Sequence, residues 1–298
     1  MAWLCAQIAL CAVGVAVGTD VEAAPVATVE PWGTDAVRVR VSAPGNSAKQ
    51  EPIVGALLPD PPAPRGHGPA LVSESGLEVT NGNLKVVVDE KTGFLTATRV
   101  SDGVVLLRQT GLEWGATSTP KDRKGSVSAA VTFAGHAGEQ VYGFGEHKNQ
   151  KVQQMPYQKK FADSLYYGYS QGGDVSIPYY SSSLGYGFVW NSPSLGSVSV
   201  SESEIEWVSN ATLGVDMWIS TTPAHCDMKT NGTASRSYLL DLLHSYVDAV
   251  GHATPMPFWT TGFIQCKDRY RNQTQVLDVA RGYVERGLPI SMIVIGAY

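Results

Sequence analysis

The sequence has few cysteines and few charged residues, and these scarcities exclude several classes of protein. Only four of the 298 residues are cysteine, and two of them fall in an apolar amino-terminal segment, so a small disulfide-stapled fold is excluded. The other two, Cys226 and Cys266, could form a disulfide bond or stay as free buried thiols. The formal net charge is −5, and without a basic patch the chain lacks the footprint of a nucleic-acid-binding protein.

Residues 1–18 contain no charged side chain. An apolar run that ends in small residues is typical of a secretory signal peptide, and we favour cleavage after it, which would place the protein in the secretory-pathway lumen or outside the cell. A membrane anchor is the alternative, because about 18 apolar residues can just span a bilayer, and a mispredicted start is a third; the protein would touch a membrane only as an anchor. Three glycosylation sequons agree with secretion: Asn210, Asn231 and Asn272.

Turn-forming residues divide most of the chain into short segments. Residues 19–70 include the Pro- and Gly-rich stretch from Pro44 to Ala70, which favours a linker or irregular region. Residues 71–232 alternate short apolar strands with turn dipeptides such as Asn81-Gly82. Many short strands of this kind predict an antiparallel β-sandwich.

The hydrophobic period then changes. Residues 233–256 carry an apolar helical stripe that ends at Gly251 and a proline-marked linker. Residues 257–298 then predict a strand, a helix capped by Thr274, and a second strand, which together form a parallel βαβ unit. A single unit of this kind cannot bury itself, and a (β/α)₈ barrel needs eight repeats and about 250 residues. The chain therefore looks like the front end of a longer enzyme.

Motifs in three stretches of the chain resemble one family, in the same order. The stretch "VYGFGEH" at 141–147 is similar to a Tyr-Gly-Leu-Gly-Glu motif, and 174–201 holds segments similar to Ile-Pro-Phe, Ser-Ser-x-Gly-Tyr-Gly and Trp-Asn-Asn-Pro. The stretch from Pro257 to Ile295 resembles the entry into the catalytic barrel of glycoside hydrolase family 31, with details closest to its α-xylosidase-like branch. Together the motifs cover roughly 141–295.

The resemblance implies a mainly β fold, with a galactose-mutarotase-like antiparallel β-sandwich followed by the first βαβ unit of a (β/α)₈ barrel. It also implies retaining hydrolysis of terminal α-linked glucose or xylose, in which one carboxylate attacks the anomeric carbon and another carboxylic acid protonates the leaving oxygen. The family's Trp-x-Asp-Met-Asn-Glu nucleophile motif does not occur in this sequence. We therefore expect the chain alone to be inactive, and we expect no cofactor or metal because carboxylates carry the chemistry.

The resemblance also places candidate sugar-binding residues. Asp268 matches a position that lines the first sugar subsite. Gly296, followed by Ala297, stands where the family has an Asp that binds sugar hydroxyls. Either a contact with the sugar is lost or the last residues come from a misread exon junction, and we favour the second. The long polar segment 148–174 favours a solvated loop. If it instead leans over the sugar site, as a loop from this region does in the family, then Tyr157 and Phe161, with Lys159 and Lys160 between them, suit the faces and hydroxyls of a sugar ring.

Two functions of other classes stay open from the sequence. One is a non-catalytic carbohydrate-binding sandwich, and the other is an aldose epimerase of the mutarotase type that would use Glu146 and His147. Gly143 and Gly145 are interpreted as turning a strand end, because a phosphate loop would need a third glycine and a following helix. A metal at His225–Asp227 is disfavoured because adjacent side chains point in different directions. Glucose versus xylose preference, linkage and oligomeric state are left open.

Overall fold

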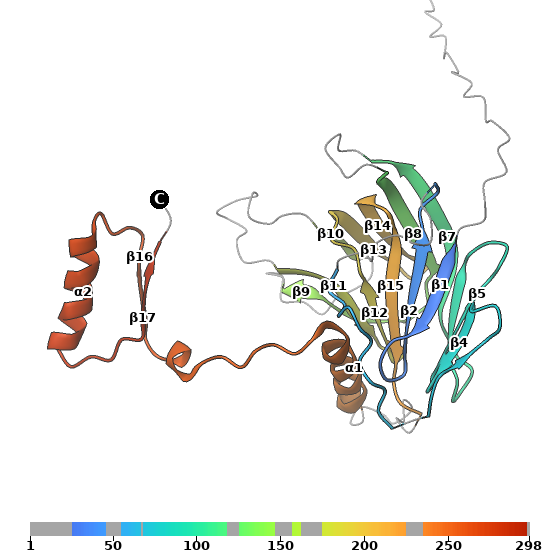
Figure 1. Ribbon diagram of the computed structural model, residues 1–298, viewed down its shortest axis with the longest axis horizontal. Coiled ribbons are helices and arrows are strands. Elements are labelled where there is room, and N and C mark those ends of the chain that lie inside the picture. Colours follow the sequence, from blue (N-terminus) through green and yellow to red (C-terminus); the bar gives the residue numbers. More distant parts are fainter. Residues whose placement is uncertain are drawn as a thin grey trace, which may run out of the picture. The chain divides into compact units, whose positions relative to one another are not determined.

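The computed structural model describes residues 26–45, 55–66, 68–117, 125–146, 157–161, 175–224 and 235–296. The chain divides into two compact units, with the boundary between Gly251 and His252. The first unit is built from two antiparallel sheets and a helix (Figure 1). The second holds a short parallel sheet and one α-helix. The protein is therefore mainly β, as the sequence predicts.

The six-stranded sheet has the order β1-β2-β15-β12-β11-β9, and every pair is antiparallel. Its strands are β1 (Ala27–Pro31), β2 (Ala36–Ser42), β9 (Val141–Glu146), β11 (Val175–Ser182), β12 (Tyr186–Trp190) and β15 (Gly214–Thr221). The nine-stranded sheet has the order β10-β13-β14-β8-β7-β6-β5-β4-β3. Its strands are β3 (Leu71–Val72), β4 (Glu78–Asn81), β5 (Leu84–Val88), β6 (Leu95–Arg99), β7 (Val105–Ala116), β8 (Val127–Ala134), β10 (Tyr157–Phe161), β13 (Gly196–Val200) and β14 (Glu204–Thr212).

The main core lies between these two sheets. Alternate residues of each strand face inward, as the pleat of a half-buried strand requires; in β5, Leu84, Val86 and Val88 are buried and the residues between them are not. Aromatic side chains fill the centre, where Trp207 and Tyr180 stack with ring centroids 6.2 Å apart. The antiparallel sandwich predicted for residues 71–232 is present across the part of that range that the structure describes.

Residues 19–70 differ from the predicted linker. Strands β1 and β2 belong to the six-stranded sheet, and β2 pairs with β15 from Gly214↔Ser42 to Ser220↔Ala36. The reason is the alternation in "AVRVRVS", which sends three valines into the main core. The sandwich therefore begins before residue 71, and the linker interpretation of this region is wrong for both strands.

A second, smaller core covers the outer face of the six-stranded sheet. Helix α1 (Ser235–Val250) packs there together with residues 55–58, which we call the strap. Tyr246 of α1 stacks on Tyr179 of β11 at a centroid distance of 4.0 Å. The buried members of this core are Trp32, Ala36, Leu57, Tyr179, Val189, Trp218 and Ala249. Gly251 ends the helix with a φ of +93°, as the sequence predicts.

The second unit contains the predicted βαβ arrangement. It consists of a short 3₁₀ turn, η2 (Phe258–Thr261), then β16 (Ile264–Lys267), α2 (Gln273–Glu285) and β17 (Met292–Ile295). The two strands are parallel, in register from Ile264↔Met292 to Lys267↔Ile295. The helix cap differs from the prediction: Asn272, not Thr274, is the N-cap, and its Oδ1 accepts from the Gln275 amide at 2.9 Å. Among the described helices of both units, none is long and apolar enough to cross a membrane.

Candidate functional site

The carboxyl ends of β16 and β17 bring two predicted site residues together. Parallel strands end at the same edge of their sheet, so Asp268, which follows β16, and Gly296, which follows β17, are neighbours. A Cβ atom at position 296 would lie 3.0 Å from the main-chain oxygen of Asp268 and 3.1 Å from that of Lys267. The parallel pairing of β16 and β17 therefore brings together two residues that the resemblance assigned separately to the sugar site.

The Asp268 carboxylate is exposed and makes no hydrogen bond or ion pair with the residues that the structure describes. An ionised carboxylate accepts hydrogen bonds through both oxygens, so it can receive the hydroxyls of a sugar. In the same loop Tyr270 is only 5% exposed, and its hydroxyl is buried without a partner among the described residues. The Lys267 ammonium lies 5.9 Å from the centre of the Tyr270 ring. This loop therefore offers a free carboxylate and an unsatisfied hydroxyl at the strand ends.

Tyr157 and Phe161 lie in a different unit. The structure corrects their expected loop: residues 157–161 form β10, an edge strand whose register with β13 runs from Tyr157↔Val200 to Phe161↔Gly196. The side chains of β10 and the rest of segment 148–174 lie outside what the structure describes. Residues 157–161 therefore form an edge strand paired with β13, not the solvated loop that the sequence predicts.

The "YGFGE" motif forms an irregular strand. In β9, Gly143, Phe144 and Gly145 have φ values of +143°, +67° and +99°, and the register with β11 shifts between Ser176 and Tyr180. A positive φ is unusual for phenylalanine; here the ring is fully buried, 5.6 Å from that of Tyr180. The glycines therefore serve the backbone of an irregular strand, inside β9 rather than at the strand end that the sequence predicts. The Glu146 side chain and His147 lie outside the described residues.

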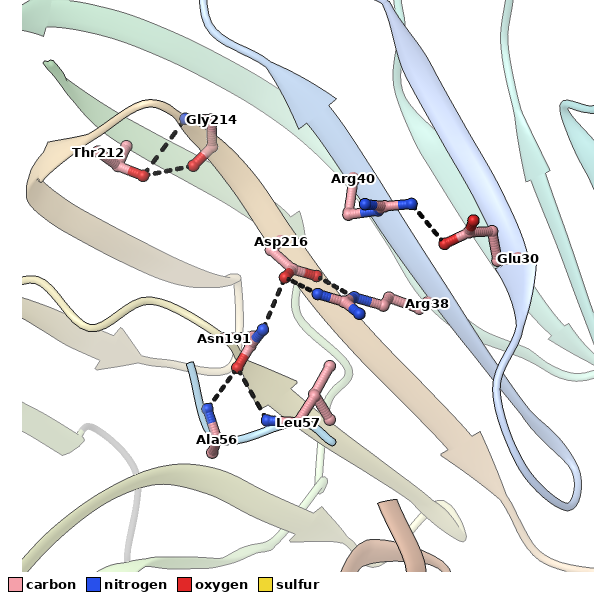
Figure 2. A network of polar contacts seen from close by, with 9 residues as sticks. All are labelled: Glu30, Arg38, Arg40, Ala56, Leu57, Asn191, Thr212, Gly214 and Asp216. Atoms are coloured by element: carbon pink, nitrogen blue, oxygen red, sulfur yellow. Dashed lines mark hydrogen bonds and ion pairs between the residues drawn. The ribbon is translucent and has the colours of Figure 1, made fainter. Parts of the chain in front are cut away.

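A buried ion pair joins β2 and β15, two adjacent strands of the six-stranded sheet (Figure 2). It was not predicted from the sequence. Arg38 donates from Nε to Asp216 Oδ1 at 2.9 Å and from Nη2 to Oδ2 at 2.6 Å, and the two side chains are 5% and 0% exposed. The guanidinium also lies 4.4 Å from the centre of the Trp32 ring. Asn191 donates to Asp216 Oδ2 at 2.6 Å, which completes the network. The nearby pair Arg40–Glu30 is about one-third exposed, at 33% and 36%.

A second buried polar cluster surrounds Glu139 at the end of the main core. Its Oε1 accepts from Ser182 at 2.5 Å and from Tyr186 at 2.7 Å, while Oε2 has no partner among the described residues. Burial raises the pKa of Tyr186 well above its usual value, and the neighbouring Tyr180 hydroxyl and the Glu139 carboxylate raise it further. Glu139, Ser182 and Tyr186 are all buried, and we interpret the cluster as structural.

The other predicted residues have mixed outcomes. Asn210 lies in β14 and Asn272 at the start of α2, and both are exposed. Cys266 is exposed, which contradicts the free buried thiol that was one of its two alternatives. Three predictions lie outside the described residues: Asn231, Ala297 and His225–Asp227, the last of which contains Cys226.

The chain thus combines an antiparallel β-sandwich with a parallel βαβ unit that carries polar residues at its strand ends. Comparison with known families agrees. Residues 26–198 match the glycosyl hydrolase 31 N-terminal galactose mutarotase-like domain, and residues 253–298 match the glycosyl hydrolases family 31 TIM-barrel domain. The chain belongs to glycoside hydrolase family 31.

Relatives extend this comparison. An uncharacterized family 31 glucosidase of Pseudescherichia vulneris is 30% identical over 289 residues, which are 90% of this chain and 49% of the relative. An α-xylosidase of Saccharolobus solfataricus is 28% identical over 53% of this chain and 20% of its own length. Among solved structures, a family 31 α-xylosidase from a soil metagenome, complexed with xylose, has a TM-score of 0.66 and 27% identity, over 91% of this chain and 39% of that one. The chain thus spans about half or less of these proteins.

Proposed function

We propose that this chain is the amino-terminal part of a retaining α-glycosidase that hydrolyses terminal α-linked xylose or glucose. The observation that carries the proposal is the order of the two family matches, a mutarotase-like sandwich and then a barrel start, together with relatives described as an α-xylosidase and a family 31 glucosidase. The sandwich supports the barrel, and the barrel binds and cleaves the sugar. Because the sequence has no Trp-x-Asp-Met-Asn-Glu motif, the nucleophile must come from further β/α repeats.

The exposed apolar surface of the second unit supports this need for further repeats. In β17, Ile295 is 61% exposed, and in β16, Ile264 is 40% exposed. On α2, Val284 is 71% exposed. Parallel sheets are normally covered on both faces, and a two-stranded sheet cannot cover its own. Additional strands and helices would bury these side chains and would bring catalytic carboxylates to the edge where Asp268 lies.

At that edge we assign Asp268 the role of accepting a sugar hydroxyl. Gly296 offers no side-chain acceptor, and a missing hydrogen bond to a charged group costs about 1.5–3 kcal/mol of binding. The sugar would therefore depend more strongly on Asp268. In a longer protein that contains the catalytic carboxylates, Asp268→Asn would raise KM more than it lowers kcat, because the contact is made in ground and transition states alike.

The experiment starts from the transcript. Sequencing it beyond the codon for Tyr298 would reveal whether the frame continues into the two-aspartate motifs, and the encoded protein would be assayed on aryl α-xylosides and α-glucosides. Proton NMR of the first product should show the α-anomer, as retention requires. A β-anomer, or no hydrolysis of either substrate by a protein that contains both motifs, would overturn the proposal.

We also propose that the protein enters the secretory pathway, is cleaved after residue 18 and carries glycans. The apolar segment 1–18 and the exposed Asn210 and Asn272 support this. Amino-terminal sequencing of the mature protein and a gel shift on treatment with an endoglycosidase test it. An intact segment 1–18 in membrane fractions would favour the anchor instead.

A further inference from the structure

The segment Trp190–Pro193, one of the motifs noted in the sequence, contains Asn191, whose side chain forms hydrogen bonds with the strap. Asn191 is 1% exposed. Its Oδ1 accepts from the main-chain amides of Ala56 at 2.7 Å and Leu57 at 3.3 Å (Figure 2). One carboxamide thus satisfies two consecutive amides of the strap, although 134 residues separate Asn191 from Leu57.

The sheet fixes the orientation of this carboxamide. A carboxylate can only accept hydrogen bonds, so Asp216 must face the Nδ2 group of Asn191, at 2.6 Å. The Oδ1 atom therefore has to point at the strap. Arg38 holds Asp216 in turn through two hydrogen bonds. The arrangement is a preformed receptor for two main-chain amides.

The strap is also hydrogen-bonded to helix α1. The Leu58 amide donates to the Ala249 carbonyl at 2.9 Å, which satisfies one of the carbonyls that a helix leaves unpaired in its last turn. Leu57, Trp218 and Ala249 share the second core. Asn191, the strap and the last turn of α1 are thus linked by a continuous set of contacts.

The two cores are separate clusters on opposite faces of the six-stranded sheet. Proteins open locally in cooperative units whose stability differs from that of the whole. We propose that Asn191 is a positioning residue that latches the strap and the C-terminal turn of α1 onto the outer face of this sheet, and that this layer opens as a unit while the sandwich stays closed. The inference does not depend on the proposed catalytic function.

Hydrogen exchange followed by mass spectrometry on the full chain tests the latch. Asn191→Ala should speed exchange of peptides from 55–66 and 238–250 by about tenfold or more, because two strap amides lose their acceptor. Peptides of β5 and β8, in the main core, should change little. Asn83→Ala is the matched control: Asn83 is also buried and uses both ends of its carboxamide, toward Ser101 and Thr222, but touches neither the strap nor α1 among its hydrogen bonds.

Gly55→Ala perturbs the same contact from the strap side. A Cβ on Gly55 would overlap the Asn191 carboxamide, so this variant should also speed exchange of the strap and α1. In the Asn191→Ala background the obstacle is gone, and adding Gly55→Ala should then have no further effect. Additive effects, or equal acceleration of β5 and β8 in either single variant, would overturn the proposal, and the Gly55 variant decides it even if Asn191→Ala does not fold.

Discussion

Removing Asp216 should be among the most damaging single changes in the sandwich. Asp216→Ala leaves the Arg38 guanidinium 5% exposed and without its carboxylate, and it also leaves the Asn191 amide without an acceptor. Breaking a buried pair by removing one partner costs about 3–5 kcal/mol. Since domains are stable by about 5–15 kcal/mol, the loss is a large part of the total. Urea unfolding followed by far-UV circular dichroism would measure it.

The double variant Arg38→Met with Asp216→Leu distinguishes the cost of an unpaired buried charge from the cost of lost packing. Replacing both members of a buried pair by apolar groups of similar size is often neutral, so the remaining cost should be only the orphaned Asn191 amide, about 1–3 kcal/mol. Glu30→Ala, in the one-third-exposed pair with Arg40, is the control and should cost under about 1 kcal/mol. A double variant as unstable as Asp216→Ala would refute the argument, because an unpaired buried charge would then not be the cause.

Three further predictions concern other parts of the fold. Burial raises the pKa of Tyr179 to about 12 from an ordinary 10. The contribution of the neutral phenol to the free energy of unfolding should therefore be complete below pH 10 and be lost as the pH rises toward 12. Across this range the free energy of unfolding should fall less in Tyr179→Phe than in the unsubstituted protein. Gly143→Ala would place a Cβ 2.5 Å from the Tyr179 carbonyl oxygen at a φ of +143° and should lower the free energy of urea unfolding by about 3 kcal/mol. The control Gly138→Ala, whose Cβ would have nothing within 4 Å, should lower it by about 1–2 kcal/mol. Equal costs would contradict the steric reason. Asn272→Ala should destabilise α2 by about 1 kcal/mol through the lost cap, while Thr274→Ala removes only the sequon. Hydrogen exchange of α2 should therefore speed up in Asn272→Ala alone, and any glycan should be absent from both variants.

Local patterns predicted much of the fold. The period-two alternation and the turn dipeptides located the sandwich, and the shift to a helical period located α1 and α2. Strands β1 and β2 were missed because the Pro- and Gly-rich stretch after them dominated the interpretation. The burial of Arg38 depends on Asp216, 178 residues away in the sequence, a partner that no local pattern reveals.

The candidate site was only partly predictable from the sequence. The resemblance assigned Asp268 and Gly296 to the sugar site separately, and the structure shows them as neighbours because the parallel strands β16 and β17 end at one edge. Tyr157 and Phe161 were expected in a loop because the segment that contains them is long and polar, but backbone pairing with β13 makes residues 157–161 an edge strand. The Asn191 latch had a sequence signal, its motif, but the strap that it binds carries none.

Gly296 and Asp268 have a closer relation than two residues at one edge. A Cβ at position 296 would come within 3.0–3.1 Å of two main-chain oxygens of the loop after β16, a distance at which the loop must give way by a few tenths of an ångström. The loop can therefore approach β17 as it does because residue 296 has no side chain. Any larger residue would move the main chain that carries Asp268, and with it the only carboxylate that we assign to the sugar. The size of the residue at the end of β17 and the position of the Asp268 main chain after β16 are thus sterically coupled.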